Sequence, residues 1–277
     1  MTRKILTFFK YVLLCIVALI SLFPFIWMLL GMTNATVDIT AGNLKIGSEF
    51  MNNMKNLFAS DLDFLGALKN SALAAFVTTF FALIVSSAAG YAFEIYKSKR
   101  RERVFNVLLL SMMIPFAALM IPLFRIFSKI SAMGFDVIGI DSFISLIIPS
   151  VSTAFLIFFF RQNTKTFSKE MLEAARMDGL SEWGLFFKIY MPTLKNTYAA
   201  AAIITFMNSW NNYIWPLITI QTPAKRTIPL ILSAMGSSYT PDYGMIMCGI
   251  VIATIPTAII FLLMQKYFVA GMLGSVK

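Results

Sequence analysis

A stripe of polar side chains interrupts an otherwise apolar segment in the C-terminal half of the chain. In TFMNSWNNYIWP these hydroxyl and amide groups stand at i, i+3, i+4 and i+7, on one helical face: Thr205, Asn208, Ser209 and Asn212. Amides are costly in hydrocarbon unless they are hydrogen-bonded or wet, so this face is predicted to point inward. Two roles fit equally well: hydrogen bonding between helices, or lining a path for a hydroxylated solute.

A second polar stretch, EAARMDGLSEWGLFFKIYMP, runs from Glu173 to Pro192. It begins inside KEMLEAARMD, which predicts a short helix ended by Gly179, because glycine readily adopts the left-handed conformation of a helix stop. Ser181 is expected to cap a second helix, which Pro192 would close. One face of that helix would be aromatic, at i, i+3, i+4 and i+7: Trp183, Phe186, Phe187 and Tyr190.

The first of these two helices is charged on one side and apolar on the other. Glu173 is expected to pair with Arg176, three residues further on. The small side chains of Ala174 and Ala175 would let another protein approach closely. From the residues alone, the stretch is either such a docking surface or an interfacial helix that packs only on its own bundle.

Several kinds of chemistry are excluded. The chain has no histidine, so histidine-based catalysis and imidazole metal sites are impossible. Its two cysteines are not spaced for zinc, and no glycine-rich phosphate loop is present. Glu94 is the one acid near hydrocarbon, a poor basis for the carboxylate relay of an ion-coupled carrier. We therefore expect no catalytic residue, no metal and no cofactor bound by this chain, which has no visible energy source of its own.

The elements that must position these residues are membrane helices. The chain has 277 residues, of which 58% are hydrophobic and 13% are charged. A helix needs ~20 apolar residues to cross ~30 Å of hydrocarbon. Six segments meet that requirement: about 11–32, 68–96, 104–124, 142–160, 196–220 and 243–269. We predict an all-α membrane protein whose residues 1–277 form a single domain.

The distribution of charge predicts the orientation. With the N-terminus placed in the cytoplasm and six spans, the whole net excess of +10 falls on the inner side. Basic loops are retained on the cytoplasmic side, so both termini and the loop 161–195 are predicted to be cytoplasmic. The first outer loop, 33–67, is expected to hold one or two short helices. The positive charge reports topology, and we expect no nucleic-acid partner.

The charged stretch also resembles a known family. E-A-A-x3-G-x9-I-x-L-P is the inner-loop signature of bacterial ABC importer permeases, with Met191 here in place of the leucine. The residues that match are Glu173, Ala174, Ala175, Gly179, Ile189 and Pro192. Further stretches, such as FPFIWMLLGMTN, AAGYAF and SWNNYIWPL, make the whole chain similar to the carbohydrate-uptake permeases related to the second maltose permease subunit. The tail GMLGSVK departs from the usual family ending, G-x-x-x-G-A-V-K-G.

This resemblance implies a fold, a function and partners. The fold would be the six-span type I importer permease in the cell membrane, paired with a second permease chain. A cytoplasmic ATP-binding subunit dimer, which holds ATP and Mg, would dock on the matched residues, with Glu173 as the charge contact. An extracytoplasmic sugar-binding protein would deliver the substrate near Gly236, Ser237, Ser238 and Tyr239.

The transported solute is the least constrained part of that expectation. The resemblance implies a carbohydrate, with an oligosaccharide favoured. Glycerol phosphate, sialic acid or another solute of an ABC importer remains an alternative, and an ion-coupled secondary carrier is a weaker one. A membrane enzyme is disfavoured, because the chain shows no catalytic constellation.

Overall fold

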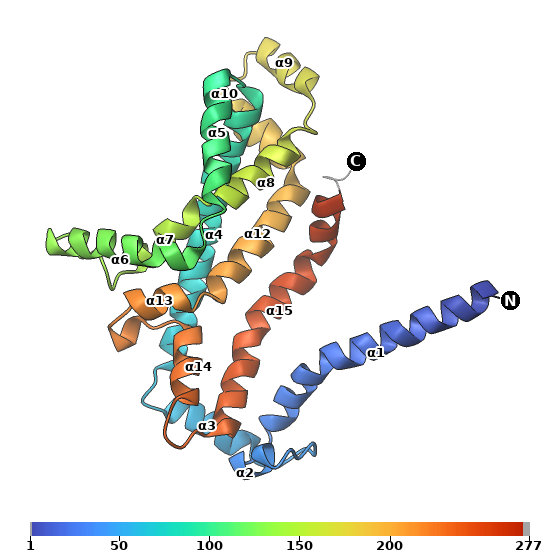
Figure 1. The fold of residues 1–277 in the computed structure, drawn as a ribbon, viewed down its shortest axis with the longest axis vertical. Coiled ribbons are helices and arrows are strands. Elements are labelled where there is room, and N and C mark those ends of the chain that lie inside the picture. The colour runs from blue at the N-terminus through green and yellow to red at the C-terminus, as the bar shows by residue number, and fades with distance from the viewer. Residues whose placement is uncertain (1, 274–277) are drawn as a thin grey trace. The chain divides into compact units, whose positions relative to one another are not determined.

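The computed structural model describes residues 2–273, and that range is helical, without a strand (Figure 1). Long apolar runs form the long helices, and polar or proline-containing stretches separate the short ones. The helices of the first half are α1 (Thr2–Gly31), α2 (Thr36–Thr40), α3 (Phe50–Ala59), α4 (Phe64–Ile95), α5 (Lys99–Ser111), α6 (Phe116–Ala132) and α7 (Phe143–Val151). They are followed by α8 (Ala154–Thr164), α9 (Lys169–Met177), α10 (Glu182–Gly184), the π-helix Leu185–Tyr190, α11 (Met191–Thr193), α12 (Lys195–Trp210), α13 (Ile214–Thr219), the 3-10 turn Pro223–Lys225, α14 (Ile228–Gly236) and α15 (Tyr243–Leu273).

The chain divides into two compact units. Met1–Leu65 and Ile231–Pro256 form unit 1, and Gly66–Leu230 with Thr257–Lys277 form unit 2. Unit 2 contains both polar stretches that the sequence singles out. The candidate sites below therefore lie within unit 2, apart from the loop that follows α14.

Four of the predicted spans are long apolar helices. Each exceeds the length that ~30 Å of hydrocarbon requires, and their bounds are Lys4–Gly31, Phe64–Ile95, Phe143–Thr164 and Tyr243–Tyr267. The third of these contains the short interruption between α7 and α8. The first is apolar on all sides, and its side chains are exposed from residue 4 to residue 26. Such a surface is suited to lipid or to another membrane subunit.

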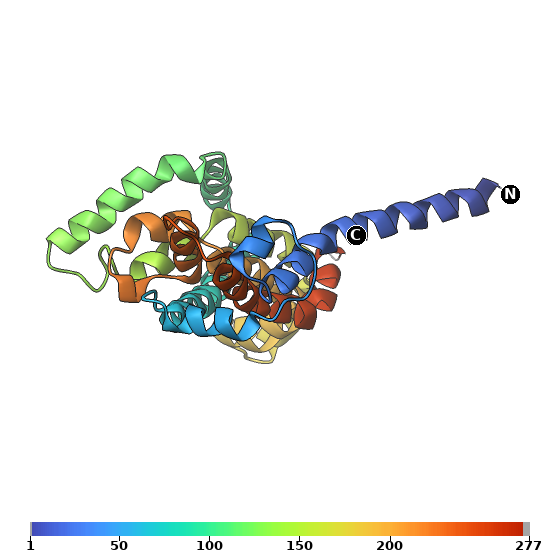
Figure 2. The same ribbon diagram turned by 90° about the horizontal axis from the view of Figure 1, so that it is seen from below.

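The predicted span 104–124 is not one continuous helix. Helices α5 and α6 meet at 104°, and Figure 2 shows α6 running away from α5. The break ends at Pro115, which has no backbone N–H and disfavours a helical conformation at Ile114. The two helices count as one broken span or as a re-entrant pair.

The predicted span 196–220 is interrupted as well. Its first part, α12, ends at Trp210 after 16 residues, and α13 begins only at Ile214. Asn211 closes α12 by donating its main-chain N–H to Met207 O at 3.0 Å. This interruption decides where the last residue of the polar stripe lies.

The segment of unit 1 between α1 and α4, which was predicted to be an outer loop, is ordered by polar contacts. It contains two short helices, α2 and α3, as the sequence predicts for 33–67. The buried Asn53 side chain donates to the carbonyls of Met32 and Asn34, at 3.0 and 2.9 Å. Asp242 accepts hydrogen bonds from the Thr36 hydroxyl and from the N–H of Met245, in the first turn of α15.

Helices α4 and α8 of unit 2 touch at Gly90. A Cβ atom at this position would lie 2.7 Å from Phe160 Cβ and 2.8 Å from Arg161 N, closer than such atoms approach. Glycine is therefore required for the close crossing. The contact fixes the start of the loop 161–195 against α4.

Candidate functional site: a polar cavity and a protruding helical turn

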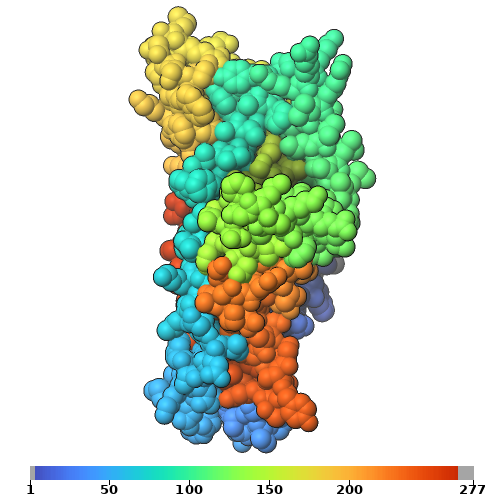
Figure 3. Space-filling model, turned by 90° about the vertical axis from the view of Figure 1, so that its left-hand side faces the viewer, coloured from blue at the N-terminus to red at the C-terminus, as the bar shows by residue number. Residues whose placement is uncertain are grey.

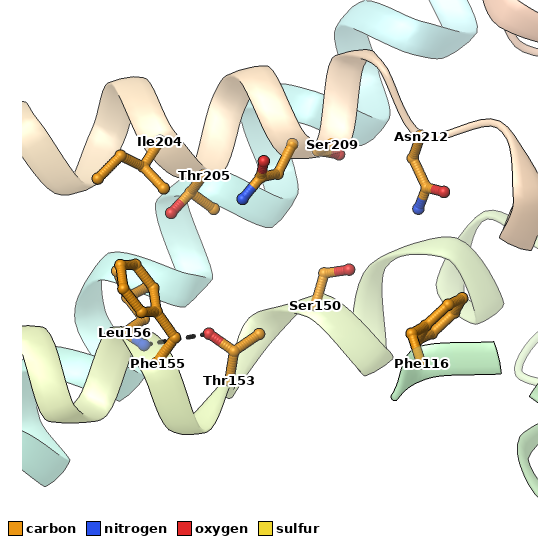
Figure 4. Close-up of a pocket in the computed structure, with 10 residues that line it drawn as sticks. Phe116, Ser150, Thr153, Phe155, Leu156, Ile204, Thr205, Ser209 and Asn212 are labelled. Atoms are coloured by element: carbon orange, nitrogen blue, oxygen red, sulfur yellow. Dashed lines mark hydrogen bonds between the residues drawn. The ribbon is translucent and has the colours of Figure 1, made fainter. Parts of the chain in front are cut away.

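A cavity of about 440 Å³ lies inside unit 2, between α12 and the junction of α7 with α8 (Figure 4). All four residues of the predicted polar stripe line it. The full lining is Phe116, Ser150, Thr153, Phe155, Leu156, Ile204, Thr205, Asn208, Ser209 and Asn212. The volume falls within the ~300–1,000 Å³ that is typical of small-molecule sites.

All four residues of the stripe were predicted to lie on one helix, but only three of them do. Thr205, Asn208 and Ser209 lie on α12, but Asn212 lies beyond the end of the helix, in the short connection between α12 and α13. The N–H of Asn212 donates to Ser209 O at 3.3 Å, so the chain stays close to the helix end. Asn212 therefore lines the same cavity although helical periodicity has ended (Figure 4).

The wall opposite the stripe contains two hydroxyl groups that the sequence analysis missed. Ser150 lies in the last turn of α7, and Thr153 lies in the break that follows, where it caps α8 by accepting from Leu156 N at 3.3 Å. A signal for them exists in the sequence: Pro149 followed by small polar residues in the middle of an apolar span. Such a break exposes backbone and hydroxyl groups that a straight helix would hide.

Two phenylalanine rings complete the cavity, and neither was predicted. Phe116 begins α6 and contacts the Trp215 ring edge-on at 6.2 Å. Phe155 lies on α8 and stacks on Phe159 at 6.3 Å. Figure 4 shows the two rings separated along the cavity, with hydroxyl and amide groups between them. An aromatic face and a row of hydrogen-bonding groups together suit a solute with both C–H faces and hydroxyls.

The cavity lining contains no charged side chain. A phosphate or carboxylate solute is bound most strongly by charge-assisted hydrogen bonds from Arg or Lys. An uncharged polyhydroxylated solute fits this lining better than an anion does. Whether the stripe binds solute or other helices of an assembly stays a prediction.

The charged stretch forms the helix–turn–helix that the sequence predicts. Ser168 caps α9 by accepting from Met171 N at 3.2 Å, and Glu170 lies in the first turn. Gly179 follows α9 with φ +80°, the left-handed conformation expected of the stop. Ser181 caps the next helix by accepting from Gly184 N at 3.2 Å. Figure 3 shows this yellow segment at one end of unit 2.

Two details of the second helix were predicted wrongly. Residues Leu185–Tyr190 form a π-helix, and the wider π turn changes the angular spacing of side chains. The aromatic residues therefore do not share one face. Phe186 and Tyr190 are buried, whereas Trp183 and Phe187 are exposed and stack on each other. The second error is that Pro192 does not close the helix, because α11 continues to Thr193.

The residues matched to the inner-loop signature differ in how far they are exposed. Glu173, Ala174, Gly179 and Pro192 are exposed, and Ile189 is half-buried. Ala175 is only 5% exposed and packs into the chain's own core. Contrary to the prediction, its side chain is therefore not accessible to another protein. Met177, which was not predicted, is 90% exposed. The protruding surface is thus Glu173, Ala174, Met177 and Gly179.

Arg176 has a different partner from the one expected. Its guanidinium lies 3.0 Å from the carboxylate of Glu182, across the turn, rather than pairing with Glu173 within α9. Gly179 permits this approach, because the left-handed residue reverses the chain between the two short helices. Glu173 consequently remains on the exposed side.

The residues predicted to face a binding protein lie after α14. Gly236 ends that helix, and the Ser237 hydroxyl donates back to Ser233 O at 2.8 Å. Ser238 and Tyr239 are exposed, the tyrosine completely. The exposure suits a protein contact, which stays a prediction. The tail residues 274–277 lie outside the described residues.

Comparisons with known proteins show the family of the chain. Residues 82–274 match the family model described as binding-protein-dependent transport system inner membrane component. The chain is 45% identical over 275 residues to the lactose transport system permease protein LacG of Rhizobium radiobacter, covering 99% of this chain and 98% of that one. It is 36% identical over 265 residues to the arabinooligosaccharides transport system permease protein AraQ of Bacillus subtilis, covering 94% and 92%.

A solved structure has the same fold. It is a bacterial ABC transporter involved in the import of the acidic polysaccharide alginate, and the match has a TM-score of 0.84. The aligned region covers 96% of this chain and 98% of that one at 21% sequence identity. This likeness supports the predicted importer-permease fold.

Proposed function

Because the chain belongs to the family of binding-protein-dependent transport system inner membrane components, we propose that it is one permease subunit of an ABC importer for a small uncharged oligosaccharide. It is a multi-pass protein of the inner membrane. The single observation that supports the choice of solute is the cavity, which combines hydroxyl, amide and aromatic groups and has no charged side chain in its lining.

The proposed partners follow from what this chain has and lacks. It has no phosphate loop, so a separate cytoplasmic subunit dimer would bind ATP and Mg and hydrolyse the nucleotide. Helix α9 exposes Glu173, Ala174 and Met177 and is the docking surface we assign to that subunit. A second permease chain would complete the pathway, and an extracytoplasmic binding protein would deliver the sugar near Tyr239.

Two rivals are less well supported. Glycerol phosphate and sialic acid are anions, and their recognition calls for cationic side chains that the cavity lining does not contain. An ion-coupled carrier needs an acid placed to exchange protons or sodium. Glu94 is instead buried against two cations, Lys97 at 2.5 Å and Arg161 at 3.3 Å.

The experiment that tests the function is reconstitution. The tagged chain is purified from its own cells, and the copurifying proteins are identified by mass spectrometry. The complex is placed in liposomes with its binding protein, and ATP-dependent uptake of radiolabelled lactose is compared with uptake of radiolabelled glycerol 3-phosphate. We expect an ATPase and a second permease in the complex, and ATP-dependent uptake of the sugar alone. Uptake of glycerol 3-phosphate alone, or uptake without ATP, would contradict the proposal.

A further inference from the structure

Three side chains join the protruding turn of unit 2 to its longest helix: Tyr96, Arg176 and Glu182. Tyr96 follows the last residue of α4, Arg176 lies in the last turn of α9, and Glu182 begins α10. Figure 3 shows the yellow turn beside the teal end of α4. We refer to these three residues as the clasp.

The clasp is held by directional contacts. Arg176 donates to both carboxylate oxygens of Glu182, Nε to Oε1 at 3.0 Å and Nη2 to Oε2 at 3.4 Å. The Tyr96 hydroxyl donates to Glu182 Oε2. These hydrogen bonds, from Tyr96 first and Arg176 second, hold the pKa of Glu182 below its usual value, so the carboxylate is charged at neutral pH. The Arg176 guanidinium also lies 6.0 Å from the centre of the Tyr96 ring.

The end of α4 is fixed from a second direction by Arg101. Its guanidinium lies 5.5 Å from the Tyr96 ring centre, and it donates to the Tyr96 carbonyl oxygen. Ser98 caps α5, on which Arg101 lies. Tyr96 is therefore held between two guanidinium groups, one from α5 and one from the turn.

The apolar contacts beneath the clasp hold the turn without orienting it. Leu172 and Ala175 of α9 pack in a buried cluster with Tyr91 of α4 and Tyr190. Apolar contacts are non-directional, so they allow α9 to rotate or slide over this core. A bidentate ion pair and a hydrogen bond to its carboxylate restrict both movements, because each requires a particular geometry.

We propose that the clasp makes α9 and α10 move as one body with α4, so that Tyr96, Arg176 and Glu182 are positioning residues for coupling ATP hydrolysis to sugar passage. This inference rests on the proposed function. A chain of contacts also connects α4 to the cavity, so that a movement of α9, α10 and α4 can reach the cavity. The tight crossing at Gly90 joins α4 to α8, and α8 presents Phe155 to the cavity.

The transport test uses the reconstituted complex and single substitutions that remove one contact each. Tyr96→Phe removes only the hydroxyl, and Glu182→Gln removes the charge that both partners contact. Lys188→Gln is the control, since Lys188 is an exposed cation of the π-helix that follows the turn and has no contact with the clasp among those described. The measurement is the number of ATP molecules hydrolysed per molecule of radiolabelled lactose taken up. We expect this ratio to rise about two- to fivefold in both clasp variants, the size expected for loss of an exposed charged contact, and to stay unchanged in the control.

Exchanging the charges of Arg176 and Glu182 distinguishes a positioning role of the clasp from a merely structural one. Arg176→Glu alone and Glu182→Arg alone each place like charges across the turn, so both should raise the ratio. The double variant restores an ion pair of opposite polarity and should bring the ratio back toward that of the wild type. A merely structural role would instead lower the yield of complex and leave the ratio constant.

A second measurement needs neither sugar nor ATPase. Spin labels at Phe81 on α4 and Lys169 on α9 occupy exposed positions, and pulsed dipolar spectroscopy reports the distribution of distances between them. The distribution should broaden in Tyr96→Phe and Glu182→Gln and not in Lys188→Gln. Unchanged distributions, or broadening with an unchanged ATP-to-sugar ratio, would overturn the inference. Absence of uptake by the wild-type complex would instead count against the proposed function, and the spin-label result would still stand.

Discussion

The guanidinium of Arg161 lies 3.3 Å from the carboxylate of Glu94, and the two side chains are only 6% and 5% exposed. Arg161 also pairs with Glu102 at 2.6 Å and lies 3.9 Å over the ring of Phe105. One buried cation thus joins α4, α5 and α8 at the point where the loop 161–195 begins. Such a group is stabilising only while its partners remain, because an unpaired buried charge is costly.

Arg161→Met should therefore destabilise the protein strongly. The substitution leaves Glu94 buried with Lys97 as its remaining cation, at a cost of roughly 3–5 kcal/mol. Thermal unfolding of the purified complex in detergent measures the effect. Arg103→Met is the control, because Arg103 is an exposed cation on α5. Adding Glu94→Leu to Arg161→Met should recover much of the loss. Equal stability of the two single Arg variants would show that the buried pair contributes nothing.

The hydrogen bonds and the ion pair around Asp141 should make the stability of the folded protein depend on pH. The Asp141 carboxylate accepts from the N–H groups of Gln221 and Thr222 at 2.9 and 3.0 Å, and Lys225 lies 3.2 Å away. Burial acts to raise the pKa of Asp141, but the hydrogen bonds from Thr222, Gln221 and Lys225 outweigh it and lower the pKa to about 2. A lowered folded-state pKa stabilises the fold above the unfolded value of 3.8, and this contribution is lost as the pH falls from there toward 2.

Asp141→Asn isolates that charge, because asparagine tolerates the positive φ of 57° at this position. We expect the variant to be less stable than the wild type by about 2 kcal/mol at pH 7. This difference in stability between the variant and the wild type should become smaller as the pH is lowered from 4 toward 2. Asp136→Asn, an exposed acid of the same loop, is the control and should show no such difference. A difference that is constant across this pH range would exclude the carboxylate as its source.

The polar stripe can be tested against a neighbouring amide. Asn208→Leu and Asn212→Leu remove hydrogen-bonding groups from the cavity and should reduce ATP-dependent sugar uptake by about tenfold each, as for one lost hydrogen bond in a binding site. Asn211→Leu is the matched control, since Asn211 does not line this cavity and donates to Met207 O on its own helix. If the Asn208 and Asn212 variants fail to assemble with the second permease, the stripe bonds to other helices and does not bind solute.

The helix ends and most of the polar stripe could be predicted from the sequence, because they depend on residues that are close together in the chain. Gly179 ended one helix and Ser181 began the next as expected, because capping and the left-handed stop need only a residue and its neighbours. The polar stripe was found because three of its four residues obey the 3.6 period of α12. Asn212 reached the same cavity through a turn that periodicity does not describe.

The rest depends on contacts between distant residues. Glu182 lies six residues from Arg176, a spacing that no helix rule favours, and the approach follows from the reversal at Gly179. The π-helix at Leu185–Tyr190 separated Trp183 and Phe187 from the buried aromatic residues, and no local signal distinguished it from an α-helix. Phe116 joined the cavity through the sharp break before α6, which hydropathy alone describes as a continuous span.

The orientation can be tested by labelling. Single cysteines at Ser168 and Ser238 occupy exposed positions, in a background without the free thiols Cys15 and Cys248. Since the net excess of +10 falls on one side of the proposed topology, the two positions should react from opposite sides with a membrane-impermeant thiol reagent. In intact cells or spheroplasts, only position 238 should be labelled. Labelling of position 168 from outside would reverse the proposed topology.

Docking of the ATPase should depend on the exposed side of α9. Glu173 offers a carboxylate that is free of the ion pair between Arg176 and Glu182, and Gly179 has a φ of +80° that proline cannot adopt. Gly179→Pro also removes the N–H that donates to Arg176 O at 3.0 Å. Both Glu173→Ala and Gly179→Pro should leave the protein inserted and paired with the second permease.

The measured quantities are retention of the ATPase during purification and ATP hydrolysis stimulated by the sugar-loaded binding protein. Loss of one hydrogen bond to a charged group, ~1.5–3 kcal/mol, would weaken docking roughly tenfold or more in Glu173→Ala. Gly179→Pro should act more severely, and Gly179→Asn should be mild because asparagine tolerates a left-handed backbone. Glu170→Ala is the control, since Glu170 accepts from the Ser168 hydroxyl at the far end of α9. Full stimulated hydrolysis in both Glu173→Ala and Gly179→Pro would mean that α9 is not the element that couples the permease to its ATPase.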